Sequence, residues 1–365
     1  MSCGSGVLSW LDLSVAKGWA MPRASGENTA DPCRCISEDG TRAVFHGLGL
    51  TAVPGWLADL TTLTHLDLSR NRLSVLPEWL ASLASLTFLD VRGNDLVTLP
   101  DSFGELHALT ALDLSRNGLT ALPAWLGDLA ALTSLRAGGN QLAALPDAVH
   151  LPSSLTHLDV AGNRLTAVPD SLRHLGTLTY LDLEDNHLSA LPDWLGDLVA
   201  LRELRLRDNM LIALPESMAG IACLALLYAT GNRFATVPQP LRYLTGLTHL
   251  YLSRNQLVRL PVWLGELTSL VHLYLGCNQL VDLPASVGNL TALTHLDLGD
   301  NRLTGLPDSL SQLSSLELIT IGGNPLHSPL AEIAREGTGA VRSFLGLVSI
   351  AARELWASKL QPQSR

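Results

Sequence analysis

Lysine is nearly missing from this chain of 365 residues. Lys17 and Lys359 are the only two, and every other basic residue is an arginine. Neither lysine belongs to a GxxxxGKS/T phosphate-binding loop, and neither lies in a strand of the kind that carries a kinase lysine. The sequence therefore gives no support to nucleotide chemistry of these two types.

Long apolar runs, a basic excess and a cysteine framework are also missing. No apolar run reaches the roughly 18 residues of a membrane span, although 47% of the residues are hydrophobic. The net charge of -10 argues against nucleic-acid binding, because phosphate contacts need a basic surface. The five cysteines are scattered, and no charged start is followed by an apolar stretch at the N-terminus. We therefore expect a soluble, cytoplasmic protein without a disulfide framework.

What the chain has instead is a repeat of 23 residues. Asparagine marks it at an unbroken interval, in Asn71, Asn94, Asn117, Asn140, Asn163, Asn186, Asn209, Asn232, Asn255, Asn278, Asn301 and Asn324. In the repeat LTHLDLSRNRL, Leu66 and Leu68 alternate with Asp67, which is typical of a strand with one buried face. The leucines that follow recur at spacings of three and four and predict a short helical or 3₁₀ return. One repeat cannot bury its leucines alone, so the pattern predicts stacked repeats with a continuous core.

The core pattern LxxLxLxxNxL resembles the leucine-rich repeat family over residues 43 to about 328. The resemblance implies an α/β solenoid: a right-handed horseshoe with a parallel, concave β-sheet and short helical or 3₁₀ segments on the convex side. We divide the chain into a poorly ordered N-terminal segment (1–32), an N-terminal cap with a degenerate first repeat (33–62), twelve repeats of which the last is partial (63–328), and a C-terminal capping helix and tail (329–365).

Both ends of a solenoid need caps, because the terminal repeats expose core. Cys33 and Cys35 look like a reduced version of the cysteine-rich cap of extracellular leucine-rich repeat proteins, without its later cysteine. At the other end, apolar residues at helical spacing predict one amphipathic capping helix, with Thr338 as its N-cap. Those residues are Val341, Phe344, Leu345, Val348 and Leu355. This segment resembles the one that closes the repeat domains of Roco proteins and of Ras-associated intracellular leucine-rich repeat proteins.

The third, fifth and seventh positions of each LxxLxLxxN face outward and stack into ladders about 4.8 Å apart. Aspartate fills most of the fifth positions, and we interpret it as a structural or solubilising residue on a solvated face. Tyrosine replaces it in three consecutive repeats, at Tyr228, Tyr251 and Tyr274, and predicts a contiguous aromatic strip. Because exposed aromatic patches with nearby arginine are typical of interfaces, we predict partner binding here. The alternative, that the tyrosines only shield the sheet, stays open.

We assign eleven residues to this candidate binding surface. They are Tyr180, Glu203, Arg205, Arg207, Leu226, Tyr228, His249, Tyr251, His272, Tyr274 and His295. Neighbouring histidines of this set could share a zinc ion with Asp297, or form a pH-sensitive partner contact. Because the same slot carries histidine in ordinary repeats such as that of His65, we assign no metal site and no cofactor.

The tryptophans are periodic as well, two residues after the repeat proline. They are Trp56, Trp79, Trp125, Trp194 and Trp263. We predict half-buried packing between adjacent turns on the convex side, with a convex partner site as the alternative.

No catalytic motif accompanies the repeats. No serine lies in a GxSxG-like elbow, and an open sheet does not exclude water. We therefore predict a non-enzymatic scaffold that binds a protein partner on its concave face. The Roco and Ras-associated resemblance implies an alternative, a regulatory subunit in small-GTPase or kinase signalling without a GTPase of its own. A remote alternative is a fragment of a leucine-rich repeat ubiquitin-ligase effector, although no cysteine follows Cys277 as a nucleophile.

Overall fold

The computed structural model describes residues 35–145 and 151–346. The segment predicted to be poorly ordered (1–32), Cys33 and the two helix positions Val348 and Leu355 lie outside these ranges. The chain divides into two compact units, unit 1 ending at Asn163 and unit 2 beginning at Arg164.

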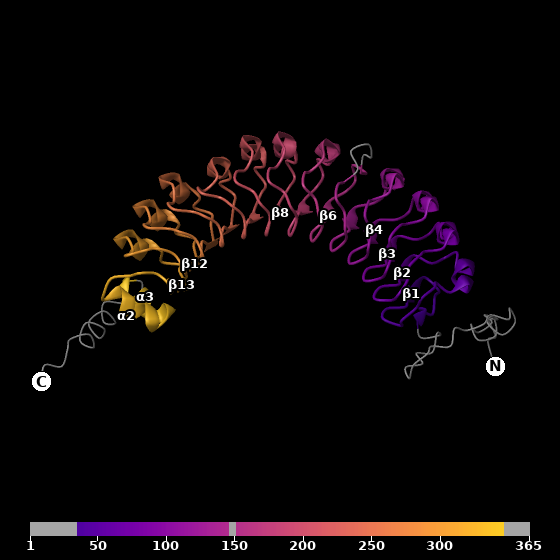
Figure 1. Cartoon of the computed structure of the whole chain (residues 1–365), viewed down its shortest axis with the longest axis horizontal. Helices are drawn as coiled ribbons and strands as arrows, with labels where there is room; N and C mark the ends of the chain where they lie inside the picture. Colours follow the sequence, from indigo (N-terminus) through magenta and orange to yellow (C-terminus); the bar gives the residue numbers. More distant parts are fainter. Residues whose placement is uncertain (1–34, 146–150, 347–365) are drawn as a thin grey trace, which may run out of the picture. The chain divides into compact units, whose positions relative to one another are not determined.

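Unit 1 alternates three-residue strands with 3₁₀ segments (Figure 1). Its strands are β1 (Arg42–Val44), β2 (His65–Asp67), β3 (Phe88–Asp90), β4 (Ala111–Asp113), β5 (Ser134–Arg136) and β6 (His157–Asp159). Its 3₁₀ segments are η2 (Gly55–Asp59), η3 (Glu78–Ser82), η4 (Asp101–Glu105) and η5 (Ala124–Asp128). Residues 146–150 lie outside the described ranges, between β5 and β6.

Unit 2 continues the alternation and ends in two short helices. Its strands are β7 (Tyr180–Asp182), β8 (Glu203–Arg205), β9 (Leu226–Tyr228), β10 (His249–Tyr251), β11 (His272–Tyr274), β12 (His295–Asp297) and β13 (Leu318–Thr320). Its 3₁₀ segments are η6 (Asp170–His174), η7 (Asp193–Asp197), η8 (Glu216–Gly220), η9 (Gln239–Tyr243), η10 (Val262–Glu266), η11 (Ala285–Asn289) and η12 (Asp308–Gln312). The helices are α2 (Leu330–Arg335) and α3 (Thr338–Phe344).

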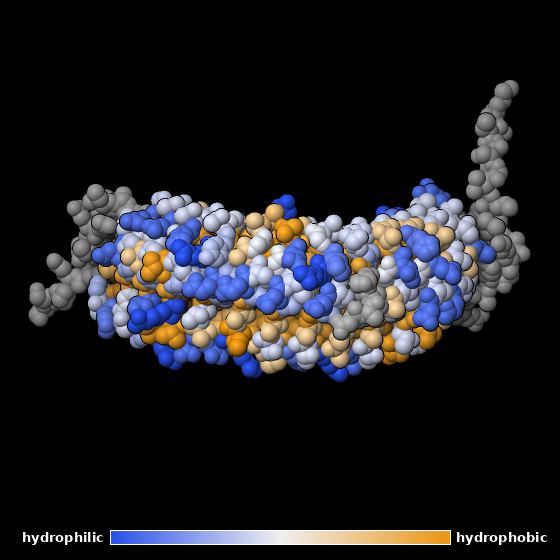
Figure 2. Space-filling view, turned by 90° about the horizontal axis from the view of Figure 1, so that it is seen from above, coloured by the Kyte–Doolittle hydropathy of each residue, from blue (hydrophilic) through white to orange (hydrophobic). Residues whose placement is uncertain are grey.

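In each unit, neighbouring strands pair in parallel with a register of one repeat. Leu66 lies opposite Leu89 in unit 1, and Leu250 lies opposite Leu273 in unit 2. The strands line the inner, concave side of each unit, and the 3₁₀ segments line the outer side (Figure 1). Figure 2 looks onto this outer side, where hydrophilic residues are mixed with hydrophobic patches. The predicted α/β solenoid with a parallel sheet and short 3₁₀ returns is confirmed.

The repeat leucines form the core that the sequence pattern predicts. Leu66, Leu68, Leu73, Leu80 and Leu83 are all 0% exposed, and the equivalent leucines of the inner repeats are buried likewise. Each fully buried leucine contributes about 1.5–3 kcal/mol of transfer free energy, so the stacked repeats hold together mainly through this core. Among the described residues, no helix has the length and apolar content to cross a bilayer.

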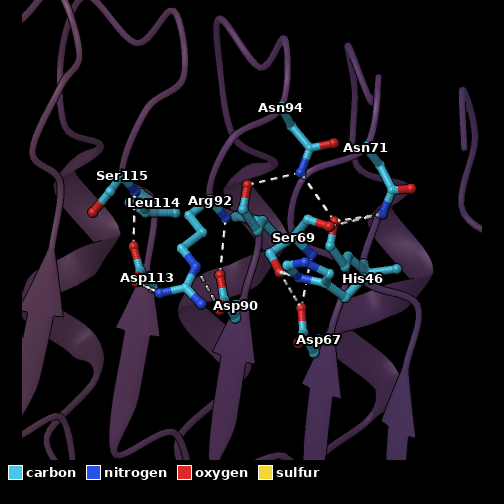
Figure 3. Close-up of polar contacts among 12 residues, drawn as sticks. His46, Asp67, Ser69, Asn71, Asp90, Arg92, Asn94, Asp113, Leu114 and Ser115 are labelled. Carbon is cyan, nitrogen blue, oxygen red and sulfur yellow. Dashed lines mark hydrogen bonds and ion pairs between the residues drawn. The ribbon is translucent and has the colours of Figure 1, made fainter. Parts of the chain in front are cut away.

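The repeat asparagine closes the bend after each strand and ties it to the preceding repeat. Asn255 accepts the N–H of Phe234 at 3.1 Å and donates to the carbonyls of Ala229 and Leu252, both at 3.0 Å. In unit 1, Asn94 donates in the same way to the carbonyls of two repeats (Figure 3). The asparagine amide therefore pairs with the backbone N–H and C=O groups of the bend, where the hydrogen bonds between strands have ended, as the sequence pattern predicts.

The C-terminal cap differs from the prediction of one helix with Thr338 as N-cap. Gly337 is the N-cap residue of α3, and its φ of 93° separates α3 from α2. Such a φ is open to glycine, whereas other residues adopt it only with strain. Thr338 is the first helical residue, and its hydroxyl donates to the carbonyl of Ile319 on β13 at 3.1 Å. Phe344 is 44% exposed, so it does not belong to the buried face that includes Val341 and Leu345.

Three of the five periodic tryptophans are more deeply buried than the sequence predicts. Trp125, Trp194 and Trp263 are 7%, 7% and 8% exposed, whereas Trp56 and Trp79 are half-buried. The low exposure of these three side chains leaves little of their rings for a partner on the convex side.

Candidate functional site

Three tyrosines lie side by side on the sheet face of unit 2. Tyr228, Tyr251 and Tyr274 are register partners on β9, β10 and β11, and all three are half-buried. Their ring centroids are 4.5 and 4.8 Å apart, with planes only 8° and 10° from parallel. The contiguous strip predicted from the sequence is thus present on the sheet face, outside the leucine core. Whether it binds a partner stays a prediction.

Stacking determines which part of each ring is available to a partner. Neighbouring tyrosines cover one another's faces, and Arg205 lies over the Tyr228 ring, with its Cζ 5.0 Å from the centroid. The tyrosine strip therefore presents ring edges and hydroxyl groups. Burial and the adjacent phenols raise the pKa of Tyr251 to about 12, so its hydroxyl remains a hydrogen-bond donor at neutral pH.

A charged network borders the strip on β7 and β8. Arg205 donates from Nε to Glu203 at 2.6 Å, and its Nη1 lies 3.8 Å from the Asp182 carboxylate. Asp182 also accepts the hydroxyl of Tyr180 at 2.9 Å, and Tyr180 lies under the same guanidinium at 5.3 Å. Burial lowers the pKa of the Arg205 guanidinium, but its bond to Glu203 and the nearby Tyr180 and Asp182 outweigh burial and raise it overall. The predicted residues Tyr180, Glu203 and Arg205 thus form one internally paired cluster rather than separate contacts.

The remaining predicted residues of this border differ in exposure. Arg207 is exposed and pairs with its chain neighbour Asp208, with Nε 2.9 Å from the carboxylate. Leu226 is half-buried on β9, where it is the register partner of His249. Leu226 therefore lies next to the tyrosine strip, and we call Leu226, the strip and the histidines beside it the central patch. Arg207 belongs to the charged edge of this patch, together with Glu203 and Arg205.

The histidine ladder runs parallel to the tyrosine strip. The rings of His249, His272 and His295 follow one another at centroid distances of 4.4 Å. Nδ1 of His249 lies 2.8 Å from the Thr248 hydroxyl, and Nδ1 of His295 lies 2.9 Å from that of Thr294. Burial lowers the pKa of His249, and burial together with the two flanking histidines lowers that of His272. Both rings are therefore neutral at neutral pH.

Metal binding has no geometric support in the described part of the chain. Within residues 35–145 and 151–346, no three histidine, cysteine, aspartate or glutamate side chains are grouped so that they could hold an ion.

Three aspartates of the fifth position are buried and the other three, Asp67, Asp159 and Asp297, are half-buried. This corrects the solvated-face part of their interpretation and supports the structural part. Asp90, Asp113 and Asp182 are 4%, 7% and 5% exposed. Asp90 accepts the backbone N–H of Arg92 at 3.0 Å, and Asp113 accepts that of Ser115 at 2.9 Å (Figure 3). Burial raises the pKa of Asp90 to about 6, even though the Arg92 N–H opposes the shift. These carboxylates satisfy the backbone where each strand ends.

The repeats that carry tyrosine at the fifth position lack this carboxylate acceptor. Sequence reasoning missed the consequence, which is that a backbone N–H at the end of each of these strands has no side-chain acceptor in the part of the chain that the structure describes. In six repeats the aspartate accepts the backbone N–H of the residue two positions after it. These aspartates are Asp67, Asp90, Asp113, Asp159, Asp182 and Asp297. No bond to the corresponding N–H of Thr230, Ser253 or Gly276 is found among the described residues. A row of backbone donors therefore lies beside the tyrosine strip. The exchange of aspartate for tyrosine was the signal that could have revealed it.

Comparisons with known proteins agree on the architecture. A family model described as Leucine rich repeat matches residues 50–96, 98–142, 153–211 and 270–326, and one described as Leucine Rich repeats (2 copies) matches 245–287. A search of the curated proteins found no match.

Solved structures provide relatives of moderate identity. A Leptospira interrogans LRR protein is 28% identical, with a TM-score of 0.65 over 81% of this chain and 93% of that one. YopM from Yersinia enterocolitica WA-314 is 29% identical, with a TM-score of 0.59 over 84% of this chain and 67% of that one. A plant peptide hormone receptor, RGFR1 in complex with RGF2, is 28% identical, with a TM-score of 0.62 over 75% of this chain. The match covers 46% of that receptor, so this chain spans about half of its length.

Proposed function

Because this chain belongs to the leucine-rich repeat family, we propose that it is a non-enzymatic interaction module that binds a protein partner on the concave sheet face of unit 2. Repeat proteins of this kind commonly use the extended inner surface of the solenoid for binding. The observation that carries the proposal is the half-buried stack of Tyr228, Tyr251 and Tyr274 on three adjacent strands.

The energetics of the tyrosine strip favour a binding role. Tyrosine and arginine dominate interface hot spots, because they combine large contact areas with hydrogen bonding. Here the rings are already held by stacking and by Arg205, so binding orders few additional side chains. A partner that covers the strip can accept hydrogen bonds from the tyrosine hydroxyls and from the backbone N–H groups of Thr230 and Ser253, which are both half-buried residues.

Three further parts of the proposal rest on other grounds. The plant receptor of the same fold was solved in complex with RGF2, which is in line with a protein or peptide partner for this chain. A cytoplasmic location rests on the sequence alone. The regulatory role in small-GTPase or kinase signalling rests on the resemblance of the C-terminal segment and stays a prediction.

A triple replacement of Tyr228, Tyr251 and Tyr274 by alanine tests the site. Partners are captured from the source cells with the parent protein and identified by mass spectrometry, and the binding of each purified partner is then measured. We expect the triple variant to lose at least about 30-fold in affinity, which is typical of hot-spot residues. Tyr243→Ala is the matched control, because Tyr243 is a tyrosine that is 63% exposed on η9, away from the strip. Circular dichroism and thermal unfolding verify the fold. Unchanged affinity in the triple variant refutes the site.

A further inference from the structure

The three histidines beside the tyrosine strip differ in the residue that precedes each one. Thr248 and Thr294 precede the outer two, whereas Val271 precedes His272. Each threonine hydroxyl donates to a main-chain carbonyl of the preceding repeat, at 3.0 Å from Thr248 to Ala225 and at 3.1 Å from Thr294 to Val271. A hydroxyl has one proton, so towards the histidine it can only accept.

The threonines therefore fix the tautomer of the outer histidines. Nδ1 of His249 and of His295 must carry the proton that it donates to the threonine oxygen. In the neutral ring, Nε2 then carries a lone pair. No hydrogen bond to Nε2 of either ring is found among the described residues, so this acceptor is left for a partner.

His272 has the opposite arrangement. Its Nδ1 is buried and has no partner within the described part of the chain, because Val271 has no hydroxyl. A proton on this nitrogen would be a buried donor without an acceptor, which is costly. The proton therefore lies on Nε2, at the far side of the ring. The charged ring is disfavoured for the same reason, since it needs protons on both nitrogens.

Together the ladder presents an acceptor, a donor and an acceptor on adjacent strands, with 4.4 Å between neighbouring rings. The residues next to the ladder add uncharged groups: Leu226, the tyrosine strip and the backbone N–H groups of Thr230 and Ser253. Charged side chains lie at the two ends of the strip, with Arg205 over the Tyr228 ring and Asp297 opposite Tyr274. A carboxylate would meet two lone pairs of the ladder, and an ammonium group would meet the central N–H. A carboxamide avoids both conflicts, because it supplies a donor and an acceptor side by side, as asparagine and glutamine do when they read adenine.

We propose that the histidine ladder selects a partner segment that carries asparagine or glutamine side chains, and that Val271 determines this specificity by setting the tautomer of His272. The proposal rests on the proposed function, since it names the chemistry of the partner that would cover the same face. Val271 is a positioning residue, because it acts through His272 and makes no contact of its own with the partner.

Histidine side-chain NMR on ¹⁵N-labelled protein tests the tautomers without a partner. We expect the Nδ1–H form for His249 and His295 and the Nε2–H form for His272. Val271→Thr should convert His272 to the Nδ1–H form, and the reciprocal variant Thr248→Val should convert His249 to the Nε2–H form. The proposal is overturned if His272 has the same tautomer as His249 in the parent protein, or if neither substitution converts its neighbouring ring.

A random peptide library, displayed on phage and selected on the parent protein, tests the partner chemistry. Peptides that also bind the triple tyrosine variant are removed. We expect the remaining peptides to be rich in asparagine and glutamine and to bind the Val271→Thr variant about tenfold more weakly, because a donor–acceptor pair is then mismatched. Peptides that are acidic or basic, or that bind both proteins equally, overturn the inference but leave the proposed function standing. A library without any tyrosine-dependent binder contradicts the proposed function and the inference together.

Discussion

Asparagine at the bend of a central repeat should contribute several kcal/mol to the stability of unit 2. Asn255 is 8% exposed, and its Oδ1 accepts the N–H of Phe234 at 3.1 Å. In Asn255→Ala this buried N–H loses its acceptor, which costs about 2 kcal/mol. The carbonyls of Ala229 and Leu252 each keep a bond from a neighbouring asparagine, so their losses are smaller, about 0.5–1 kcal/mol each. The sum is about 3–4 kcal/mol.

Urea unfolding followed by circular dichroism measures this cost. Asn324→Ala is the matched control, because Asn324 makes the same contacts in the last repeat but is only partly buried, and water can replace its amide there. We expect it to cost about 1 kcal/mol. Hydrogen exchange at the Phe234 amide should also accelerate in Asn255→Ala. The reasoning is refuted if Asn255→Ala costs less than about 1 kcal/mol, or no more than the control.

Three other changes test the packing and the ionisable groups. A Cβ at Gly265 would clash with the Ser286 carbonyl, so Gly265→Ala should cost about 1–3 kcal/mol in thermal unfolding. Gly246→Ala, where the nearest atom is 3.5 Å away, should cost less than about 0.5 kcal/mol, and equal losses would contradict this account. The pKa of Asp90 is raised from 3.8 to about 6, so the folded state binds more protons than the unfolded state in this window, and stability falls as pH rises through it. In Asp90→Asn this fall should vanish, with a gain of at most about 3 kcal/mol at pH 7 in urea unfolding, and an unchanged pH profile would argue against the shift. Because the pKa of Tyr251 is about 12, Tyr251→Phe should remove a step near pH 12 from an ultraviolet titration, and loss of a step near the usual value of 10 would count against the buried stack.

The sequence pattern predicted the site only in part. The tyrosine strip followed from the 23-residue interval, because equal repeats place equal positions side by side. A structural role of the aspartates was among the interpretations of the sequence, but their burial did not follow from it, since a carboxylate on an outward position is usually solvated. Asp90 is buried because Arg92 lies over it, with Nε 3.2 Å from its carboxylate, and because the backbone N–H of Arg92 turns towards it. Neither of these two contacts can be inferred from composition or periodicity.

The C-terminal cap was also predicted only in part. Helical spacing correctly indicated helix around Val341 and Leu345, because the period of apolar residues is a local property. The place of Thr338 was wrong. Its hydroxyl bonds to Ile319 of β13, nineteen residues earlier, rather than to the helix that it begins. When a side chain has two possible hydrogen-bond partners, the choice between them depends on the tertiary structure that brings each partner near.

Sequence alone determined the stacking of the repeats, the strand register and the order of side chains along each ladder, because every repeat obeys the same local rule. Only the tertiary structure decided which polar groups are satisfied. The proton of Thr248 goes to a carbonyl of the preceding repeat, and Nδ1 of His272 is left without a partner. Hydrogen bonds between repeats depend on distances and angles in three dimensions, and these determine what the sheet face offers to a partner.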